Sequence, residues 1–211
     1  GKVSVLRNGV DTAAFRPPDD RAALRAALGV TRPTVISVGH LVERKGHHLV
    51  IEALASLPGC KLIVVGEGPE RPRLTQLIAR LGLDGRVRLL GERPHAELPG
   101  LYGAADVLVL ASSREGWANV LLEAMACGTP VVASNIWGNP EVVRSRDAGL
   151  MTERSAAAIA AAIRALLADP PARAATRRYA EGYGWDETTA GQLALFRRVI
   201  AGGCSLGPSP A

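Results

Sequence analysis

Short runs of apolar, mostly β-branched residues alternate with segments of helical period through most of the chain. The apolar runs predict strands at 34–38, 62–65, 87–90, 107–110 and 131–133. The other segments predict helices near 46–57, 70–81, 95–104, 118–127 and 139–145. Strands that are apolar throughout are buried on both faces, and their alternation with helices requires right-handed crossovers and a parallel sheet. We therefore expect an α/β fold, a Rossmann-like parallel sheet with helices on both faces.

The N-terminal residues carry a different pattern from the alternating region. The apolar residues Val3 to Leu6 predict one more strand, and Asn8-Gly9 predicts a turn. The polar, proline-containing stretch that ends at Asp20 predicts a connection leading into a short helix. The chain opens on Gly1 without a methionine, and we therefore expect it to be a piece of a longer polypeptide.

Beyond about residue 150 the pattern predicts helices only. An alanine-rich run at 155–168 predicts the first, a second follows Pro170-Pro171, and a third runs from about Trp185 to Ile200. These helices form a C-terminal extension of the fold. The expected organisation is an interdomain connection and first strand at 1–20, one ligand-binding domain at 21–201, and a disordered tail at 202–211.

The composition limits the class of protein and the kinds of partner. With 211 residues, 47% of them apolar, the chain is long enough to bury one core. Neither a membrane-spanning apolar stretch nor a basic, then apolar, N-terminal leader is present, so we expect a soluble, cytoplasmic protein. Three cysteines without CxxC spacing predict neither a disulfide framework nor a metal site. The net charge of +5 comes from dispersed arginines, which suits an anionic small ligand, and we expect no nucleic-acid partner.

In a doubly wound sheet, a ligand binds in the crevice beyond the carboxyl ends of the strands. Gly66-Glu67-Gly68, in one such loop, imitates the opening of a GxGxxG dinucleotide fingerprint, but Arg71 stands at the third glycine's place. We therefore expect a tight turn beside the site there. The loops in which binding and catalytic residues are expected are those after Val38, Val65, Leu90 and Leu110.

The segment from Ser112 to Pro130 contains a strand end, a loop, a helix and the start of the next strand. Free N–H groups around Gly116 to Asn119 and the positive end of the helix dipole suit a diphosphate. Glu115 in the loop and Glu123 inside the helix supply carboxylates that accept hydrogen bonds from sugar hydroxyls. The alternative is that both glutamates are solvated and that Glu115 only stabilises the helix N-terminus.

A second loop, between residues 38 and 48, carries fixed positive charge. Arg44 and Lys45 place cations where a phosphate would lie. The alternative is that this pair is solvated surface, and we expect His47 and His48 to cap a helix or face solvent rather than bind metal. Further on, Glu141 starts a helix and faces either the site or only the helix dipole.

Together these segments resemble the C-terminal domain of the group 1 glycosyltransferases, family four of the retaining enzymes with a GT-B fold. The resemblance runs from about Leu6 to Ile200. It rests on an ordered set of motifs: Asn8-Gly9-Val10-Asp11, Phe15-Arg16-Pro17, Val38-Gly39-His40-Leu41 with Lys45-Gly46, Val65-Gly66-Glu67-Gly68, Leu90-Gly91, Ala105-Asp106-Val107, Glu115 and Glu123 separated by seven residues, and Gly128-Thr129-Pro130-Val131-Val132.

The resemblance implies a role for each matching residue. Lys45 would hold the donor diphosphate; His40 stands where relatives carry arginine, its contact with phosphate stays open, and Arg44 would compensate. Glu115 would contact the donor sugar and act with Lys45 in catalysis, and Glu123 would bind the ribose. The other implied contacts are those around the sugar and phosphate, Gly116, Trp117, Ala118 and Asn119, and those of the base-contacting loop, Leu90, Gly91 and Arg93.

The resemblance also implies a reaction. A sugar would pass from a nucleoside diphosphate to an acceptor with retention of anomeric configuration, without a cofactor or a required metal. The acceptor site would belong to an N-terminal domain that is absent here, so we expect donor binding without efficient transfer. Many relatives associate peripherally with a membrane, so the resemblance leaves such association of the full-length enzyme open, at the inner face of the membrane. The alternatives are a nucleotide-sugar epimerase or a phosphorylase of the same architecture, or a non-catalytic nucleotide-binding module.

Overall fold

Six strands form one sheet in the computed structural model, which describes residues 5–203. The strands are β1 (Thr34–Val38), β2 (Lys61–Val65), β3 (Val87–Leu89), β4 (Val107–Leu110), β5 (Val131–Ser134) and β6 (Gly149–Thr152). Their order is β3-β2-β1-β4-β5-β6, and every neighbouring pair is parallel. The predicted Rossmann-like parallel sheet is confirmed, and the direction in which strands are added reverses between β1 and β4.

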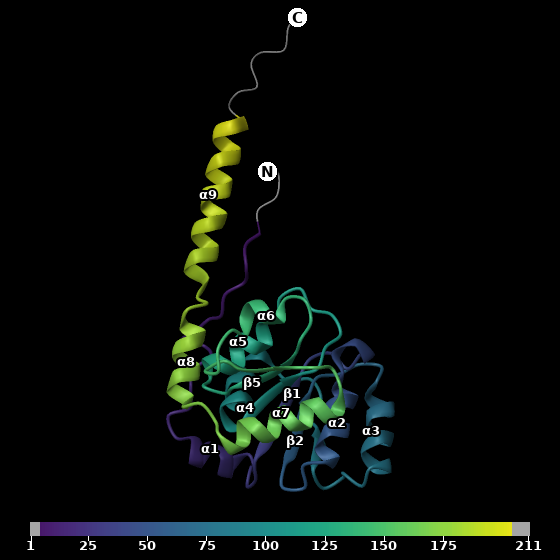
Figure 1. The fold of residues 1–211 in the computed structure, drawn as a ribbon. Helices are drawn as coiled ribbons and strands as arrows, with labels where there is room; N and C mark the ends of the chain where they lie inside the picture. Colours follow the sequence, from purple (N-terminus) through teal and green to yellow (C-terminus); the bar gives the residue numbers. More distant parts are fainter. Residues whose placement is uncertain (1–4, 204–211) are drawn as a thin grey trace, which may run out of the picture.

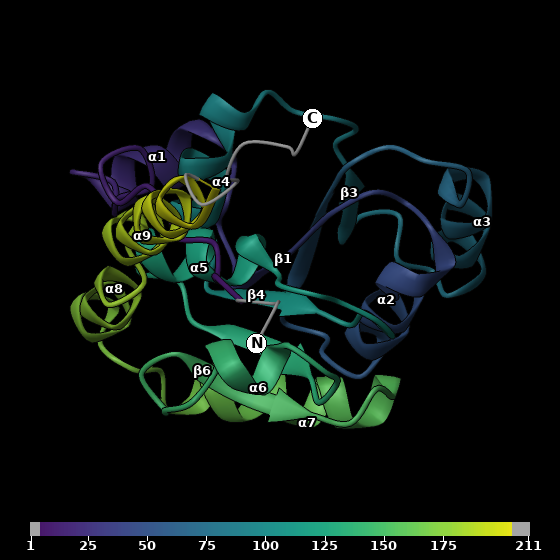
Figure 2. The same ribbon diagram turned by 90° about the horizontal axis from the view of Figure 1, so that it is seen from above.

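Helices cover both faces of this sheet. Those of the described chain are α1 (Arg21–Ala27), α2 (His47–Ala55), α3 (Arg71–Arg80), α4 (Leu98–Ala104), α5 (Asn119–Ala126), α6 (Asn139–Val142), α7 (Ala156–Ala168), α8 (Arg173–Glu181) and α9 (Trp185–Gly203), with 3₁₀ turns η1 (Glu43–Lys45) and η2 (His95–Glu97). One face carries α2, α3 and α7, and the other carries α4 and α5, with α1 and α8 beside them (Figure 1 and Figure 2). The expected helices are present, although α6 ends at Val142.

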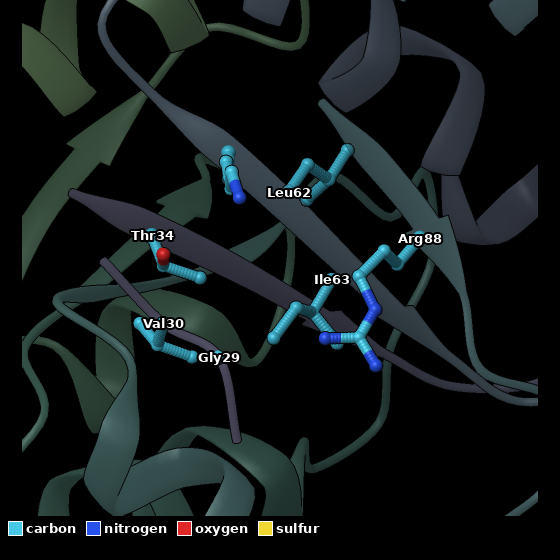
Figure 3. Close-up of a pocket in the computed structure, with 7 residues that line it drawn as sticks. Gly29, Val30, Thr34, Leu62, Ile63 and Arg88 are labelled. Carbon is cyan, nitrogen blue, oxygen red and sulfur yellow. The ribbon is translucent and has the colours of Figure 1, made fainter. Parts of the chain in front are cut away.

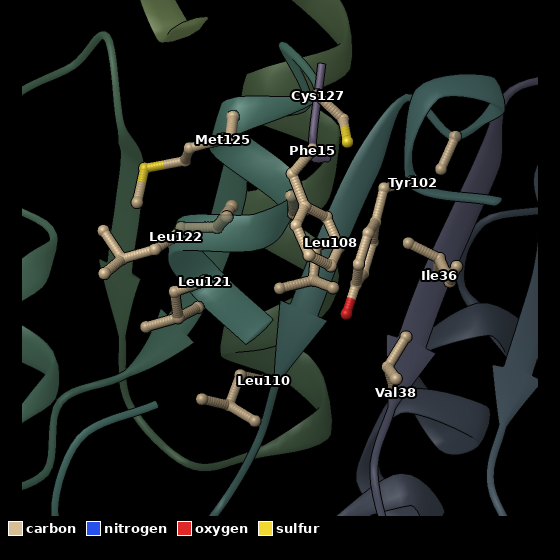
Figure 4. Packing of buried hydrophobic residues seen from close by; sticks show 14 of the residues in the cluster. Phe15, Ile36, Val38, Tyr102, Leu108, Leu110, Leu121, Leu122, Met125 and Cys127 are labelled. Atoms are coloured by element: carbon tan, nitrogen blue, oxygen red, sulfur yellow. The ribbon is translucent and has the colours of Figure 1, made fainter. Parts of the chain in front are cut away.

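Alternate residues of each strand face two separate hydrophobic clusters. In β1, Val35 belongs to the cluster with α2, α3 and α7, whereas Ile36 belongs to the cluster with α4 and α5. Figure 4 shows the second cluster, where Phe15 and Tyr102 lie beside residues of β1, β4 and α5. Because both faces are covered, the strands read as largely apolar runs. This two-sided packing fixes the strand ends and, with them, the loops at the carboxyl edge.

Local signals explain where several helices begin. Asp20 caps α1 by accepting a hydrogen bond from the N–H of Ala23, and Ser155 caps α7 by accepting one from Ala158. Pro72 lies in the first turn of α3, where a backbone N–H has no partner inside the helix. These caps place the helices without any contribution from distant contacts.

Three expectations about the chain ends and the sheet were wrong in part. Strand β6 follows a region for which only helices were expected. Val5 and Leu6 form no strand because they are 67% and 36% exposed and pair with no sheet edge in the described chain, while residues 3 and 4 lie outside it. The helix α9 continues to Gly203, so residues 202 and 203 are helical, and residues 204–211 lie outside the described part.

The last helix, α9, extends away from the sheet (Figure 1). The N-terminal segment lies along its base, where the hydroxyl of Thr188 donates to the backbone oxygen of Arg7. Among the described helices, none is long and apolar enough to cross a membrane. The apolar side chains that α9 exposes beyond its base recur at helical spacing and are Leu193, Phe196, Val199 and Ile200.

Candidate functional site

The loops that follow β1 and β4 lie side by side at the point where the strand order reverses. The N–H of Ser113 donates to the carbonyl of Arg44 at 2.8 Å and so ties one loop to the other. Gly46 has a φ of 71°, and a Cβ at this position would lie 2.1 Å from the backbone oxygen of Ala111. Only glycine fits here, so the sequence fixes how closely the two loops approach.

Lys45 and Glu115, one from each loop, form an ion pair in the crevice. The Lys45 Nζ lies 2.6 Å from the Glu115 Oε1, and the two side chains are 17% and 10% exposed. The hydroxyl of Ser112 donates to the same carboxylate oxygen at 2.6 Å. The sequence pointed to Lys45 and Glu115 separately but gave no sign of Ser112. The arrangement offers a cation for an anionic ligand and an acceptor for a hydroxyl group.

The start of α5 presents backbone N–H groups next to this pair. Within residues 5–203, the N–H groups of Gly116, Trp117, Ala118 and Asn119 donate to no other protein atom. No atom lies within 4 Å of the place that a Cβ on Gly116 would take, so the loop is open there. Free amides at the positive end of a helix dipole attract an anionic group. The loop after β4 therefore combines a carboxylate with an anion-binding backbone.

Glu123 occupies a more enclosed position inside α5. The hydroxyl of Tyr102 donates to its Oε2 at 2.9 Å, and the Nε2 of His95 lies 3.6 Å from its Oε1. Burial, and then the neighbouring Glu123 carboxylate, raise the pKa of Tyr102 well above its usual value, so the phenol stays protonated and donates. Tyr102 therefore orients Glu123, a role that the sequence did not reveal.

His40 and Arg44 lie at the rim of the crevice, and both are exposed. The Nη1 of Arg44 reaches the carbonyl of Arg114 at 3.5 Å. In the described residues, neither His40 nor Arg44 forms an ion pair with Glu115. The structure thus brings together Lys45, Glu115 and the start of α5, and leaves the two other basic residues at the edge.

His47 is buried beneath the loop after β1, so the expectation that it caps a helix or faces solvent was wrong. Its side chain belongs to a residue that is 3% exposed, and its Nδ1 lies 2.9 Å from the hydroxyl of Ser37 in β1. Burial lowers the pKa of His47 to about 4, so the ring is neutral near pH 7. The left-handed Gly46 starts α2 without a side-chain cap, which leaves the next side chain free to turn toward β1.

The loops after β2 and β3 close one side of the crevice. Gly66 has a φ of 138°, and a Cβ there would lie 2.0 Å from the backbone oxygen of Gly39. The N–H of Gly66 donates to the carbonyl of Gly91 at 2.9 Å. Leu90 is half-buried and Arg93 is exposed. The three loops therefore pack backbone against backbone beside the loop that carries Lys45.

Trp117 contributes its backbone to the loop after β4, while its ring packs elsewhere. The ring centroid lies 6.4 Å from that of Tyr183, and the guanidinium of Arg7 lies over the Trp117 ring at 5.2 Å. Arg7 also forms an ion pair of 2.6 Å with Glu141. Glu141 is therefore engaged with the N-terminal segment, which decides between the two positions that the sequence left open for it.

An open cavity of about 810 Å³ lies against the loop after β4. A much smaller crevice, whose lining includes Thr34, Leu62 and Arg88, lies at the opposite edge of the sheet, where β1 begins (Figure 3). In the described chain, no group of three His, Cys, Asp or Glu side chains could hold a metal ion. The residues that line the larger cavity are Val5, Arg7, Ser113, Arg114, Glu115, Gly116 and Trp137.

Comparison with known proteins connects this geometry to a family. The family model for glycosyl transferases group 1 matches residues 20–183. This chain is a group 1 glycosyltransferase family member. The D-inositol 3-phosphate glycosyltransferase of Mycobacterium tuberculosis (strain H37Rv) is 39% identical over 214 residues, which cover 94% of this chain and 44% of that protein. The chain therefore spans less than half the length of this curated relative.

Solved structures agree with the family and with the GT-B-type fold of this group 1 glycosyltransferase chain. Sucrose-phosphate synthase from Thermosynechococcus elongatus has a TM-score of 0.87 and 31% identity, with 96% of this chain and 54% of that chain covered. Anabaena HepE in complex with UDP has a TM-score of 0.85 and 30% identity, with 92% and 57% covered. HepE has also been solved in complex with UDP-glucose. The predicted family and fold are confirmed.

Proposed function

We propose that this chain binds the nucleoside-diphosphate-sugar donor of a retaining glycosyltransferase. The observation that carries this proposal is the Lys45–Glu115 ion pair of 2.6 Å beside the open amides at the start of α5. A diphosphate would draw the Lys45 ammonium to itself, because the ammonium and the helix N-terminus both attract anions. Glu115, still held by Ser112, would then be free to accept a hydrogen bond from a sugar hydroxyl.

The nucleoside would extend from the diphosphate toward Glu123 and the loop after β3. Tyr102 holds one oxygen of Glu123, which leaves the other oxygen for a ribose hydroxyl. The base would then lie against Leu90, Gly91 and Arg93, in part through backbone atoms. His40, at the rim, lies where it would contribute to phosphate binding when protonated.

The reaction breaks the bond between the anomeric carbon and the diphosphate oxygen. Negative charge grows on the departing diphosphate while the sugar becomes oxocarbenium-like. Lys45 and the amides of residues 116–119 would stabilise that charge, since they are already in place before the bond breaks. Such stabilisation requires no metal ion. Retention would follow if the acceptor hydroxyl attacks the face of the sugar from which the diphosphate leaves.

A calorimetric titration of the chain with UDP, GDP, ADP and the matching sugar nucleotides tests donor binding. We expect one nucleotide to bind selectively and Lys45→Gln to weaken it about tenfold to a hundredfold, the value of a hydrogen bond to a charged group. Lys61→Gln is the matched control, because Lys61 lies at the start of β2, at the far end of the strand. Equal effects of the two substitutions would count against the site, and so would unchanged binding in the presence of a chelator being absent.

The remaining part of the reaction would depend on chain outside these residues. The exposed apolar side of α9, with Phe196 at 62% and Ile200 at 73% exposure, offers a contact surface for an acceptor-binding domain. We therefore expect this chain alone to bind donor without efficient transfer. Turnover by the isolated chain at the rate of the full-length protein would contradict this division. The anomeric configuration of the full-length protein's product, measured by NMR, tests retention.

A further inference from the structure

Trp137 is the most exposed of the large apolar side chains in the described chain. Its exposure is 88%, although it lies beside well-packed segments of the domain. An indole in water forgoes the apolar burial that aromatic side chains usually contribute to a fold. Tryptophan and the other aromatic residues make up only 4% of the sequence, so this placement is unusual for the chain. A ligand that covers the ring would recover that burial.

The turn that carries Trp137 is fixed against the loop that carries Glu115. Gly138 has a φ of 94°, and a Cβ there would lie 2.6 Å from the backbone oxygen of Gly116. The N–H of Ile136 and the side-chain amide of Asn139 both donate to the carbonyl of Ser134, at the end of β5. The indole therefore stands on a hydrogen-bonded turn, at a set position relative to the loop after β4.

Trp137 and Glu115 line the same cavity of about 810 Å³. The cavity combines an aromatic ring with a carboxylate, two arginines and the open backbone at Gly116. A pyranose ring has a matching character, because its C–H face packs on an aromatic ring while its hydroxyls donate to carboxylates. A nucleobase matches less well, since Glu123 and the loop after β3 lie on the other side of the ion pair.

We propose that Trp137 is the stacking platform of a sugar subsite beside Glu115, and that it covers the apolar face of a pyranose ring. This inference rests on the proposed donor binding and deepens it. The ring belongs either to the sugar of the nucleotide donor or to a sugar of the acceptor. Both sources offer the same chemistry to the indole, and binding measurements distinguish them.

The experiment is calorimetry on the chain with Trp137→Ala and Trp137→Phe. The probes are UDP and GDP, UDP-glucose and GDP-mannose, and the methyl glycosides of glucose and mannose added to nucleotide-saturated protein. Stacking on an aromatic ring predicts a two- to tenfold loss of sugar affinity, about, in Trp137→Ala, with most of the affinity kept in Trp137→Phe. Trp185→Ala is the control, because Trp185 is 43% exposed but does not line the cavity.

The pattern of losses identifies the source of the sugar. Weaker binding of a sugar nucleotide in Trp137→Ala, with the free nucleotide unchanged, assigns the donor sugar to the subsite. Weaker binding of a methyl glycoside, with both nucleotide forms unchanged, assigns the acceptor sugar. Sugar binding that is the same with and without the indole overturns the proposal, as does an equal loss for the free nucleotide. Donor binding is judged separately, by the response of UDP or GDP to Lys45→Gln.

Discussion

Replacing His47 by asparagine should remove a defined part of the acid sensitivity of the fold. His47 is buried with its Nδ1 2.9 Å from the hydroxyl of Ser37, and burial lowers its pKa from 6.5 to about 4. In the unfolded chain the imidazole binds a proton as the pH falls below about 6.5, whereas in the folded chain it stays neutral until about pH 4. Stability from this group is therefore present above pH 6.5 and lost as the pH falls toward 4.

The size of this loss follows from the difference between the two pKa values. Each pKa unit corresponds to about 1.4 kcal/mol, so the full difference amounts to about 3 kcal/mol. Linkage gives a loss of about 1 kcal/mol by pH 5.5 and about 2 to 3 kcal/mol by pH 4.5. Asparagine keeps a polar atom near the Ser37 hydroxyl but binds no proton in this range. The variant is expected to be less stable at pH 7.5 and to lose less stability on acidification.

Urea unfolding followed by circular dichroism at pH 7.5, 5.5 and 4.5 measures this difference in the wild-type chain and in His47→Asn. His40→Asn is the matched control, because it removes an exposed histidine seven residues earlier and leaves the buried pair intact. The free energies of unfolding should converge for the wild type and His47→Asn as the pH falls, and remain parallel for the control. Parallel pH profiles for all three proteins would refute the reasoning, since His47 would then bind protons equally in both states.

Three further substitutions test other contacts. Gly66→Ala should destabilise the fold by about 2 to 4 kcal/mol through backbone strain and collision, while Gly59→Ala, with open space around it, should not; thermal unfolding compares them. Arg173→Met should cost about 2 to 4 kcal/mol of unfolding free energy, because the guanidinium donates to several backbone carbonyls, and an unchanged urea midpoint would contradict this. Tyr102→Phe should leave the far-UV spectrum intact and weaken nucleotide binding severalfold, because Glu123 loses its orienting donor; equal affinity by calorimetry would remove that role.

The buried strands were predictable because burial on both faces leaves an unbroken apolar run in the local sequence. Strand β6 was not, since Gly149-Leu150-Met151-Thr152 begins with glycine and lacks a β-branched run, and its pairing with β5 decides its structure. The residues Val5 and Leu6 show the reverse case. They carry the local composition of a strand but have no neighbouring strand in the described chain to supply hydrogen bonds.

The candidate site was predictable as a set of loops but not as a set of contacts. Lys45 and Glu115 could be named from their positions after strands, yet they are 70 residues apart, and only the adjacency of β1 and β4 makes them partners. Ser112 and Tyr102 carry no sequence signal of their own, because their roles depend on the direction of a side chain in the folded domain. The burial of His47 likewise depends on how α2 packs on β1.

The contact between Gly9 and Gly184 gives the molecule a geometrical pivot. A Cβ on Gly9 would lie 2.6 Å from the backbone of Gly184, so the incoming N-terminal segment and the turn before α9 cross there without side chains between them. At a rise of 1.5 Å per residue, the helix from Trp185 to Gly203 is a lever of about 28 Å. A rotation of about 10° at this crossing would carry the far end of the lever through about 5 Å. Small changes in backbone angle at two glycines thus become large displacements far from the sheet.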